Sequence, residues 1–330
     1  MRVVTDREFA VVQPQNALPP LDANQKSVAI LLATYNGARF LAEQLNSIER
    51  QTHTNWRVFA SDDGSSDGTL AILATYRERW GAERLRISQG PQRGHAANFL
   101  SLVQDAAIAA DYYAFCDQDD VWLEDKLERS VRSIEGVGEE RPALYGSRTV
   151  LVDIEGNSIG LSSLFSREPH LKNALVQNIA GGNTMTFNNV TRDCLRLIPH
   201  QQDVVTHDWA TYLLVSACGG VVFYDPKPSI NYRQHGENII GSNNHLSDRI
   251  LRLVWLLKGR FAEYSENNLA LVSHVWSKIP DQNAHMILHF KMMRDEPLLS
   301  RIASLKRSGL YRQTLIGTVG LWAAVLLRKI

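Results

Sequence analysis

The sequence has no excess of charge of either sign. Its 330 residues include 35 Lys and Arg and 35 Asp and Glu, so the formal net charge at pH 7 is zero. A neutral chain has no overall field that attracts the phosphates of nucleic acid, and we expect no nucleic-acid partner. Cysteine is also scarce. Cys116, Cys194 and Cys218 lie far apart in apolar surroundings, which favours reduced, buried thiols over a disulfide framework.

Long hydrophobic runs are absent as well. The chain has no stretch of roughly 18 or more apolar residues, so it predicts no membrane-spanning helix. The N-terminus has no charged start followed by an apolar run, so it predicts no secretory signal. Residues 1–26 contain three prolines and little periodicity, which indicates a flexible leader. These absences predict a cytoplasmic protein.

The first half does contain a repeated alternation of apolar runs and helical patterns. Residues 27–34 form a continuous apolar run, as expected of a parallel strand that is covered on both faces. Three more strands are predicted at 56–63, 84–90 and 111–116, and helical patterns follow the four strands at about 38–50, 70–80, 95–110 and 121–134. This alternation predicts an α/β fold with a mostly parallel sheet flanked by helices.

The pattern changes after about residue 140. Residues 141–245 contain strand-like segments around a helix predicted at 208–218, and residues 246–330 have mostly helical patterns. We therefore expect a leader (1–26), an α/β half (27–140), a mixed half (141–245) and a helical C-terminal extension (246–330).

The end of the extension is basic and apolar. Residues 297–330 contain six Lys and Arg and no acidic residue, and residues 314–327 are almost wholly apolar. Such a tail suits a membrane surface, where basic residues meet anionic headgroups. A helix docked on the protein's own core has the same pattern. Peripheral membrane contact through residues 309–330 is therefore one of two alternatives.

Polar residues gather at the ends of the four predicted strands. The polar stretches are 34–37, 62–69, 92–94 and 117–120. Taken one at a time, they are compatible with ordinary turns and helix caps. Ligands of open parallel sheets bind at the carboxyl ends of the strands, so the four stretches together predict one pocket.

Two missing motifs narrow the chemistry of this pocket. The chain has neither G-x-x-x-x-G-K-[ST] nor G-x-G-x-x-G after the first strand, which excludes a P-loop and a dinucleotide fingerprint. A phosphate site without these loops can use Mg²⁺ or Mn²⁺, held by carboxylates, phosphate oxygens and water. Asp117 and Asp119 are two apart on an extended stretch, so their carboxylates can point to the same side. Asp120 is expected to cap the helix that follows.

The ordered set TYNG, SDDGSSDGT, RGHAANF and FCDQDDVWLEDKL, within residues 28–135, resembles the family-2 nucleotide-sugar glycosyltransferases, which have the GT-A fold. FCDQDDVW is most similar to the rhamnosyltransferase-like branch. The resemblance implies that Asp117 and Asp119 form a metal-binding DxD element. It also implies that the following residues bind the nucleotide sugar: Thr34, Tyr35, Asn36, Asp62, Asp63, Arg93, Asn98, Asp117 and Gln118.

Three segments of the second half extend the resemblance. His207-Asp208-Trp209 resembles the motif whose acidic residue deprotonates the acceptor hydroxyl, which implies Asp208 as the base and its neighbours as positioning groups. On its own, Asp208 could be only a helix cap, but the helix N-terminus would keep its carboxylate ionised as a base requires, which favours catalysis. Residues 181–188 resemble the region that lines the acceptor pocket, with Gly182 and Asn183 in it. Residues 231–241 resemble the segment that closes over the diphosphate, which implies Arg233 and His235 as phosphate or metal contacts.

The resemblance implies inverting, metal-dependent sugar transfer to a hydroxyl of a surface polysaccharide or lipid-linked glycan, at the inner face of the cell membrane. The expected donor is dTDP-L-rhamnose, with UDP-sugars as the alternative. Two other classes stay open: a sugar-phosphate nucleotidyltransferase and a non-catalytic nucleotide- or carbohydrate-binding module. The former needs a basic, Gly-rich loop after the first strand, where this chain has only Arg39. Neither class requires Asp208.

Overall fold

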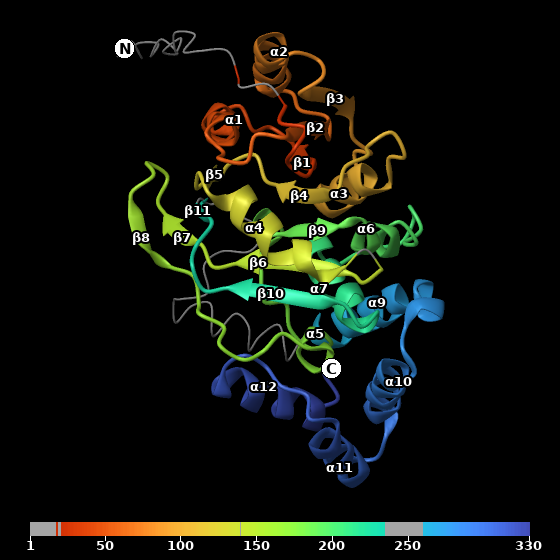
Figure 1. Ribbon diagram of the computed structural model, residues 1–330. Coiled ribbons are helices and arrows are strands. Elements are labelled where there is room, and N and C mark those ends of the chain that lie inside the picture. Colours follow the sequence, from red (N-terminus) through yellow and green to blue (C-terminus); the bar gives the residue numbers. More distant parts are fainter. Residues whose placement is uncertain (1–17, 19–20, 139, 235–259) are drawn as a thin grey trace.

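The computed structural model describes residue 18 and residues 21–138, 140–234 and 260–330. Within these residues the main feature is a seven-stranded sheet with the order β10-β6-β9-β4-β1-β2-β3 (Figure 1). Strands β1 to β4 are parallel, and β10 is parallel to β6, whereas β9 is antiparallel to both of its neighbours. The predicted mostly parallel sheet is confirmed. Its strands are β1 (Val28–Thr34), β2 (Trp56–Asp62), β3 (Leu85–Gln89), β4 (Tyr112–Cys116), β6 (Ala143–Ser147), β9 (Thr186–Asn188) and β10 (Val221–Asp225).

Strand β1 shows why helices cover both faces of this sheet. Ala29 and Leu31 belong to one apolar core, whereas Val28, Ile30 and Leu32 belong to a second core on the opposite face. Successive side chains of a strand point to opposite faces, so an unbroken apolar run needs cover on both. One face is covered by α1 (Leu41–Glu49), α2 (Thr69–Trp80) and α4 (Lys126–Ile134). The other is covered by α3 (His95–Gln104), α5 (Leu171–Ala174), α6 (Asn189–Leu195) and α7 (His207–Ala217).

A second, smaller sheet corrects the helix predicted from residue 121. Its order is β5-β11-β7-β8, formed by β5 (Val121–Trp122), β11 (Ile230–Arg233), β7 (Val150–Val152) and β8 (Ser158–Leu161). Residues 121–122 pair with β11, so the chain is extended there and α4 begins only at Lys126. The helix predicted over 95–110 also ends early, at Gln104.

The helical C-terminal extension is confirmed from residue 260 onward. It consists of α9 (Arg260–His274), α10 (Asp281–Asp295), α11 (Leu298–Ser308) and α12 (Leu315–Leu326), which lie below the sheet in Figure 1. Leu271, Phe290 and Val325 join the core that contains α3 and α7. Among the residues described here, no helix has the length and apolar character needed to cross a membrane.

Lys126 is a charged side chain inside the core. It is fully buried, and its Nζ lies 4.1 Å from the centre of the Trp122 ring without a hydrogen-bond partner among the described residues. Burial lowers the pKa of Lys126 to about 7. A lysine in the unfolded chain has a pKa near 10.4. Between about pH 7 and 10 the unfolded chain therefore binds more protons at this site, so its contribution to stability rises with pH.

We expect Lys126→Met to be more stable than the parent protein at pH 7, and the difference to shrink as the pH rises towards 10. Methionine fills the same apolar space without a charge to desolvate. The difference should narrow by at most about 1.4 kcal/mol per pH unit. Urea unfolding at several pH values measures it, with exposed Lys291→Met as the control. A difference that stays constant with pH contradicts a lowered pKa of Lys126.

Candidate active site

The loops after β1 and β2 are locked together. Thr34 Oγ1 donates a hydrogen bond to Asp62 Oδ1 over 2.9 Å. Asn36 connects the loops twice, because its backbone N–H donates to Ser65 Oγ and its Oδ1 accepts from the Ser66 N–H. Asn36 has a φ of 49°, in the left-handed region that asparagine tolerates. The motifs at 34–37 and 61–69 therefore form one structural unit.

Within this unit Asp62 and Tyr35 are placed differently. The Asp62 carboxylate accepts hydrogen bonds from Thr34, from the backbone of Gly64 and from both the backbone and the hydroxyl of Ser65. Tyr35 is 59% exposed. Asp62 thus holds the loop, and Tyr35 offers an accessible ring. Contact of either residue with a nucleoside stays a prediction.

Asp63 ties the loop after β3 to the same edge. Its two carboxylate oxygens accept from the backbone N–H groups of Gln92, at 2.6 Å, and Gly94, at 2.9 Å. Asn98 of α3 donates from Nδ2 to the Ser61 carbonyl at 2.9 Å. Both predicted nucleotide-binding side chains are buried, so they fix the backbone at the end of β2.

Arg93 lies in this loop with its side chain exposed. Its Nη1 donates to the carbonyl of His200 over 2.7 Å. His200 belongs to the segment that leads from α6 into α7. Arg93 therefore links the loop after β3 to the second half of the chain, and its contact with a nucleotide stays a prediction.

The 117–120 loop is braced against the loop after β1 by Gln118. Its Oε1 accepts from the backbone N–H of Tyr35, and its Nε2 donates to the Tyr35 carbonyl, both at 2.9 Å. A Cβ atom on Gly37 would lie only 2.1 Å from this Oε1, so glycine is needed for the close approach. Gln118 was predicted to contact the nucleotide, but its amide is used to join the two loops. The four strand ends thus meet at one edge.

Carboxylates from distant parts of the chain come together at this edge. Asp117 follows β4, and Asp208 lies in the first turn of α7. Burial, and then repulsion from Asp119 and Asp208, raises the pKa of Asp117 to about 8. The Gly182 backbone hydrogen-bonds to Asp208, and the next residue, Asn183, donates to Asp120. The 117–120 loop and the first turn of α7 are therefore connected through residues 182 and 183, and their roles as DxD element and base stay predictions.

Asp208 is not the cap of its helix. Thr206 is the N-cap, and its hydroxyl oxygen accepts from the Trp209 N–H. Asp208 Oδ1 also accepts from this N–H, at 2.7 Å. Burial raises the pKa of Asp208, although hydrogen bonds to Thr206, Trp209 and the Gly182 backbone, together with nearby His95, act in the opposite direction. A carboxylate with a raised pKa is a stronger proton acceptor.

His207 and Trp209 support the helix from the core. The Trp209 indole donates to the Ala174 carbonyl at 2.7 Å. The buried ring of His207 stacks on Phe99 with 4.1 Å between centroids, and burial lowers the pKa of His207 well below its usual value. A Cβ atom on Gly182 would lie 2.1 Å from His207 Nε2. Both residues thus position α7, and Gly182 leaves room for the imidazole.

His95 is a residue of the site that the sequence motifs did not single out. It is the first residue of α3, and its ring centroid lies 5.0 Å from that of His207. It lies close enough to Asp208 for each to shift the pKa of the other. Burial lowers the pKa of His95, and the charge of Asp208 acts in the opposite direction. The signal in the sequence was its place directly after Arg93 and Gly94.

Asp120 does not cap the following helix, so that prediction is wrong. The side chain is fully buried. Its Oδ2 accepts from Asn183 Nδ2 at 2.6 Å, and its Oδ1 accepts from the Arg233 N–H at 3.4 Å. The chain enters β5 before α4, and the pairing of β5 with β11 places Asp120 beside Arg233. Asp120 therefore connects the 117–120 loop to the second half.

Arg233 completes this connection. It is only 3% exposed. Its guanidinium donates to the carbonyls of Asp119, at 3.2 Å, and Ile154, at 2.9 Å, and pairs with Glu43 at 2.5 Å. The resemblance implied a contact with phosphate or metal, but the structure shows the guanidinium bonded within the protein. Asp120, Asn183 and Arg233 thus join the 117–120 loop to the second half of the chain.

We expect Asp120→Ala to lower the transfer rate about tenfold or more, because an unpaired buried polar group costs about 1–3 kcal/mol and the loop that carries Asp119 loosens. Asp120→Asn places two amides against each other. The double variant Asp120→Asn/Asn183→Asp restores the acid–amide pair in reverse and should recover part of the lost rate. Steady-state kinetics of both single variants and the double variant measure the coupling. If the double variant is no faster than the two single variants, Asp120 and Asn183 do not act as a unit.

The carboxylates at this edge fit a hard divalent cation. The repulsion that raises the pKa of Asp117 is relieved when a cation lies between the carboxylates. Over the described ranges no group of three His, Cys, Asp or Glu is placed to hold a metal by itself. Asp117 and Asp119 would therefore share the cation with phosphate oxygens and water, as is usual for Mg²⁺. His235, the third predicted ligand, lies outside the described residues.

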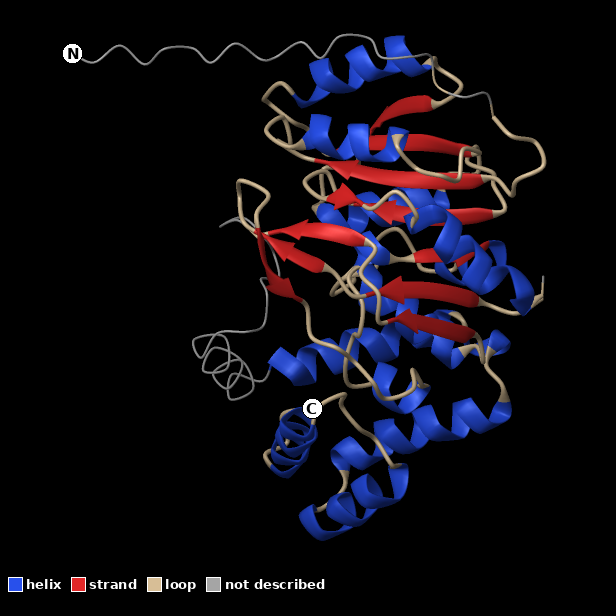
Figure 2. Ribbon diagram, turned by 60° about the vertical axis from the view of Figure 1, so that its left-hand side comes forward, coloured by secondary structure: helices blue, strands red, loops and turns tan. Residues whose placement is uncertain are grey.

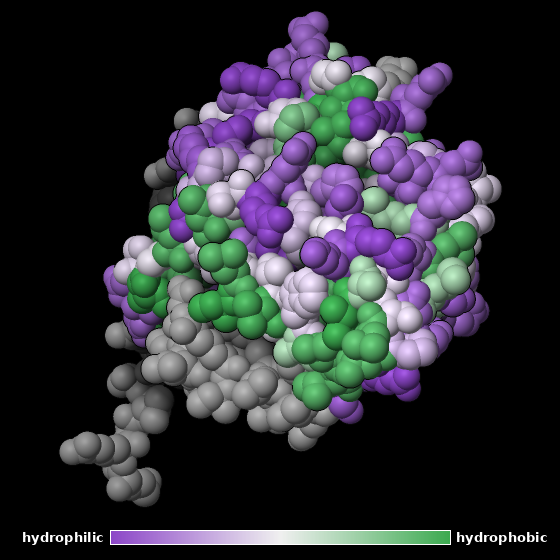
Figure 3. Space-filling model, turned by 90° about the horizontal axis from the view of Figure 1, so that it is seen from below, coloured by the Kyte–Doolittle hydropathy of each residue, from purple (hydrophilic) through white to green (hydrophobic). Residues whose placement is uncertain are grey.

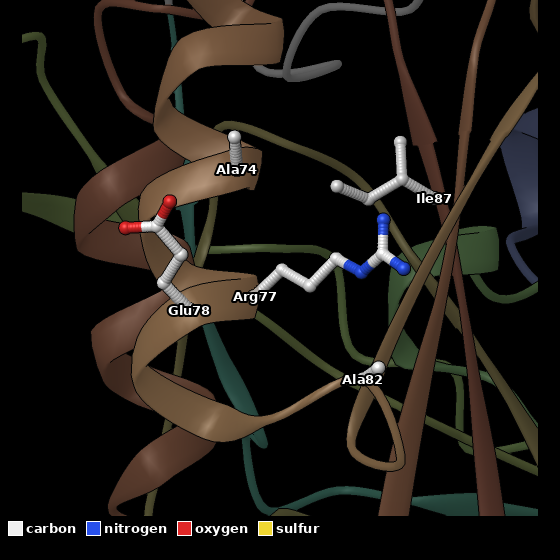
Figure 4. A pocket seen from close by; sticks show the side chains of 5 residues that line it. All are labelled: Ala74, Arg77, Glu78, Ala82 and Ile87. Atoms are coloured by element: carbon white, nitrogen blue, oxygen red, sulfur yellow. The ribbon is translucent and has the colours of Figure 1, made fainter.

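A separate hollow lies between α2 and β3 (Figure 4). It is lined by Ala74, Arg77, Glu78, Ala82 and Ile87. Ala82 precedes β3, so the hollow lies towards the amino end of that strand, whereas the carboxylates lie at the carboxyl ends. It contributes no residue to the candidate site.

A mostly parallel sheet, with loops and acidic residues that converge at its carboxyl edge, defines an α/β protein with a ligand site at that edge. Residues 29–193, which are half of the chain, match the family model described as Glycosyl transferase family 2. The chain belongs to this family and is a glycosyltransferase.

Individual relatives agree with this assignment. The chain is 28% identical over 229 residues to the dTDP-rhamnosyl transferase RfbG of Shigella flexneri, which covers 67% of this chain and 78% of that protein. TarS 1–349 of S. aureus, solved in complex with UDP-GlcNAc, has a TM-score of 0.52 and 14% identity, with 92% and 89% coverage. The mannosyltransferase PcManGT of Pyrobaculum calidifontis, solved with GDP-Man and Mn²⁺, has a TM-score of 0.51 and 16% identity, with 96% and 89% coverage. These two structures confirm the GT-A fold.

Proposed function

We propose that the protein is an inverting, metal-dependent glycosyltransferase that moves a sugar from a nucleoside diphosphate to a hydroxyl of a glycan. The observation that carries the proposal is the link between Asp208 and the 117–120 loop, because the Gly182 backbone hydrogen-bonds to Asp208 and the adjacent Asn183 donates to Asp120. Asp117 belongs to the first half of the chain, which carries the loops after β1 to β4, and Asp208 belongs to the second half. A base on one side and a diphosphate site on the other is the arrangement that direct displacement requires.

In this mechanism Asp208 takes the proton of the acceptor hydroxyl. The hydroxyl oxygen attacks the anomeric carbon on the face opposite the diphosphate, the bond from that carbon to the diphosphate breaks, and the nucleoside diphosphate leaves. Burial raises the pKa of Asp208, which suits a base. A divalent cation held by Asp117 and Asp119 would act as a Lewis acid that neutralises charge on the leaving diphosphate.

The proposed donor is dTDP-L-rhamnose, with a UDP-sugar as the alternative. Support comes from the 28% identity to a protein named as a dTDP-rhamnosyl transferase. Enzymes of this family generally use divalent metals, and the solved Pyrobaculum neighbour contains Mn²⁺.

The proposed acceptor is a surface polysaccharide or a lipid-linked glycan, bound on the side of Gly182 and Asn183. The proposed nucleotide contacts are Thr34, Tyr35, Asn36, Asp62, Asp63, Arg93 and Asn98.

We place this activity in the cytoplasm. Cys116, Cys194 and Cys218 are all free thiols. Few, widely spaced cysteines suit a reducing compartment, in which thiols stay reduced.

The test is release of nucleoside diphosphate from a panel of donors. Purified protein is incubated with Mn²⁺ or Mg²⁺ and dTDP-L-rhamnose, UDP-glucose, UDP-GlcNAc or GDP-mannose, with and without glycan acceptors. We expect release from one donor, its loss with EDTA, and inversion at the anomeric carbon by NMR. No turnover of any donor contradicts the proposal. Pyrophosphate release from a nucleoside triphosphate and a sugar phosphate would identify a nucleotidyltransferase instead.

A further inference from the structure

Helix α12 has one face in the protein and the other in solvent. Leu321, Ala324 and Val325 are buried in the core. On the opposite side and just past the helix end, five apolar residues are exposed, and they are named the α12 face: Leu315 (85%), Ile316 (75%), Val319 (69%), Leu326 (44%) and Leu327 (53%). Seen from below, apolar side chains gather in patches on this end of the molecule (Figure 3). The alternative of a helix docked on the protein's own core therefore holds for the buried face, and the α12 face is left exposed.

The α12 face is unusual for a helix in contact with water. The sequence of the helix, LIGTVGLWAAVL, contains no charged residue. A surface helix normally carries charged or polar residues on its outer side, and a contiguous exposed apolar patch usually marks a binding surface. The helix has 12 residues, which corresponds to a length of about 18 Å and is too short to span a bilayer. Its apolar face suits a partner along which it lies flat.

Exposed basic residues precede and follow α12 in the sequence. Lys306 and Arg307 are exposed at the end of α11, and Arg328 is exposed just after α12. Residues 297–330 contain no acid, although Asp295 and Glu296 lie just before this stretch. The partner of this face must therefore be apolar in its interior and negatively charged at its edge.

We propose that the α12 face docks on a membrane surface with anionic headgroups. The five apolar side chains would enter the boundary between headgroups and acyl chains, and Lys306, Arg307 and Arg328 would contact lipid phosphates. A second copy of this chain fits less well, because a twofold contact through the same face brings the basic residues of both copies together. The contact lies on α12 itself, since Leu310 and Gln313 within the predicted 309–330 segment are buried.

The position of α12 fits a lipid-linked acceptor. In Figures 1 and 2 it lies at the lower end of the molecule, on the side towards which the arrow of β10 points. This is the side of the carboxyl ends of the parallel strands, where Asp117 directly follows β4. Docking would place the membrane on the side of the active site. This orientation rests on the proposed function, whereas the docking itself does not.

Vesicle flotation of the full chain tests the docking. The vesicles contain either phosphatidylcholine alone or phosphatidylcholine with phosphatidylglycerol. The variants are Ile316→Glu/Val319→Glu on the apolar face and Lys306→Glu/Arg307→Glu beside it. Leu70→Glu is the matched control, since Leu70 is 46% exposed on α2 at the opposite end of the molecule (Figure 1).

We expect the parent protein and Leu70→Glu to float with the anionic vesicles, and each double variant to bind at least about tenfold more weakly. Nucleoside diphosphate release in solution by Ile316→Glu/Val319→Glu should equal that of the parent, which separates a failure of docking from a failure of the proposed function. Absence of parent binding to anionic vesicles overturns the proposal, and so does an equal loss in the control. A parent dimer in sedimentation that Ile316→Glu/Val319→Glu dissociates, with flotation unchanged, also overturns it in favour of self-association.

Discussion

Replacing Asp208 by asparagine is expected to slow sugar transfer by about 10²–10⁴-fold, which is the usual contribution of a general base. Asparagine has the same shape and keeps an oxygen that can accept from the Trp209 N–H, so α7 should begin at the same residue. It cannot take a proton from the acceptor hydroxyl. Removing one negative charge beside Asp117 should leave donor binding unchanged or slightly tighter. The measurements are kcat with saturating acceptor and the Kd of the donor.

Asp203→Asn is the matched control for this variant. Asp203 is exposed on the segment that leads into α7, five residues before Asp208, and the same change there should leave kcat within about twofold. Equal losses in the two variants contradict a special role for Asp208. A loss of donor binding as large as the loss in kcat assigns Asp208 to the donor site instead of to proton transfer.

Asp119→Ala is expected to remove most of the metal dependence of donor binding. With Mn²⁺ or Mg²⁺ present, the Kd of the nucleotide sugar should rise at least about tenfold, because one of two protein ligands is lost. In EDTA the parent and the variant should bind the donor with similar affinity. The variant also loses a charge that raises the pKa of Asp117, so the pKa of Asp117 should fall towards its usual value. Isothermal titration with and without the metal measures the difference.

Glu124→Ala controls for the loss of an acidic residue near this loop. Glu124 is exposed and lies two residues after the end of β5. Its replacement should leave the metal dependence of donor binding unchanged. If Asp119→Ala binds the donor in Mn²⁺ as tightly as the parent does, the metal is held elsewhere. If affinity falls equally with Mn²⁺ and with EDTA, Asp119 acts on the loop and not through a cation.

Patterns within short stretches of sequence predicted the fold well. The run at 27–34 places apolar side chains on both faces of the strand. Only a strand between two helical layers buries the side chains of both faces. The strands predicted at 56–63, 84–90 and 111–116 for similar reasons are β2, β3 and β4. Their polar ends were expected to meet because parallel strands present their carboxyl ends at one edge. The bonds of Gln118 to Tyr35 and of Asp63 to the loop after β3 connect these ends.

The roles of single side chains at that edge depended on partners far away in the sequence. Asp120 reads as a helix cap because caps are defined by the next few residues, but its partners, Asn183 and Arg233, come from 63 and 113 positions later. Arg233 reads as a ligand for phosphate until Glu43 and the Asp119 carbonyl are seen beside it. His95 is marked in the sequence only by its place after Arg93 and Gly94, because its importance comes from α7, which brings Asp208 near it.

The sequence by itself determined the alternation of strands and helices, the edge of the sheet where polar residues gather, and the membership of the chain in a glycosyltransferase family. Those features follow from periodicity, turn chemistry and ordered motifs, which act over a few residues at a time. The tertiary structure was needed to show that Asp120 is bonded inside the protein, that Asp117 and Asp119 are only partly buried, and which face of α12 is left uncovered. Burial and charge interactions depend on distances between segments that the chain folds together, and a linear pattern does not contain those distances.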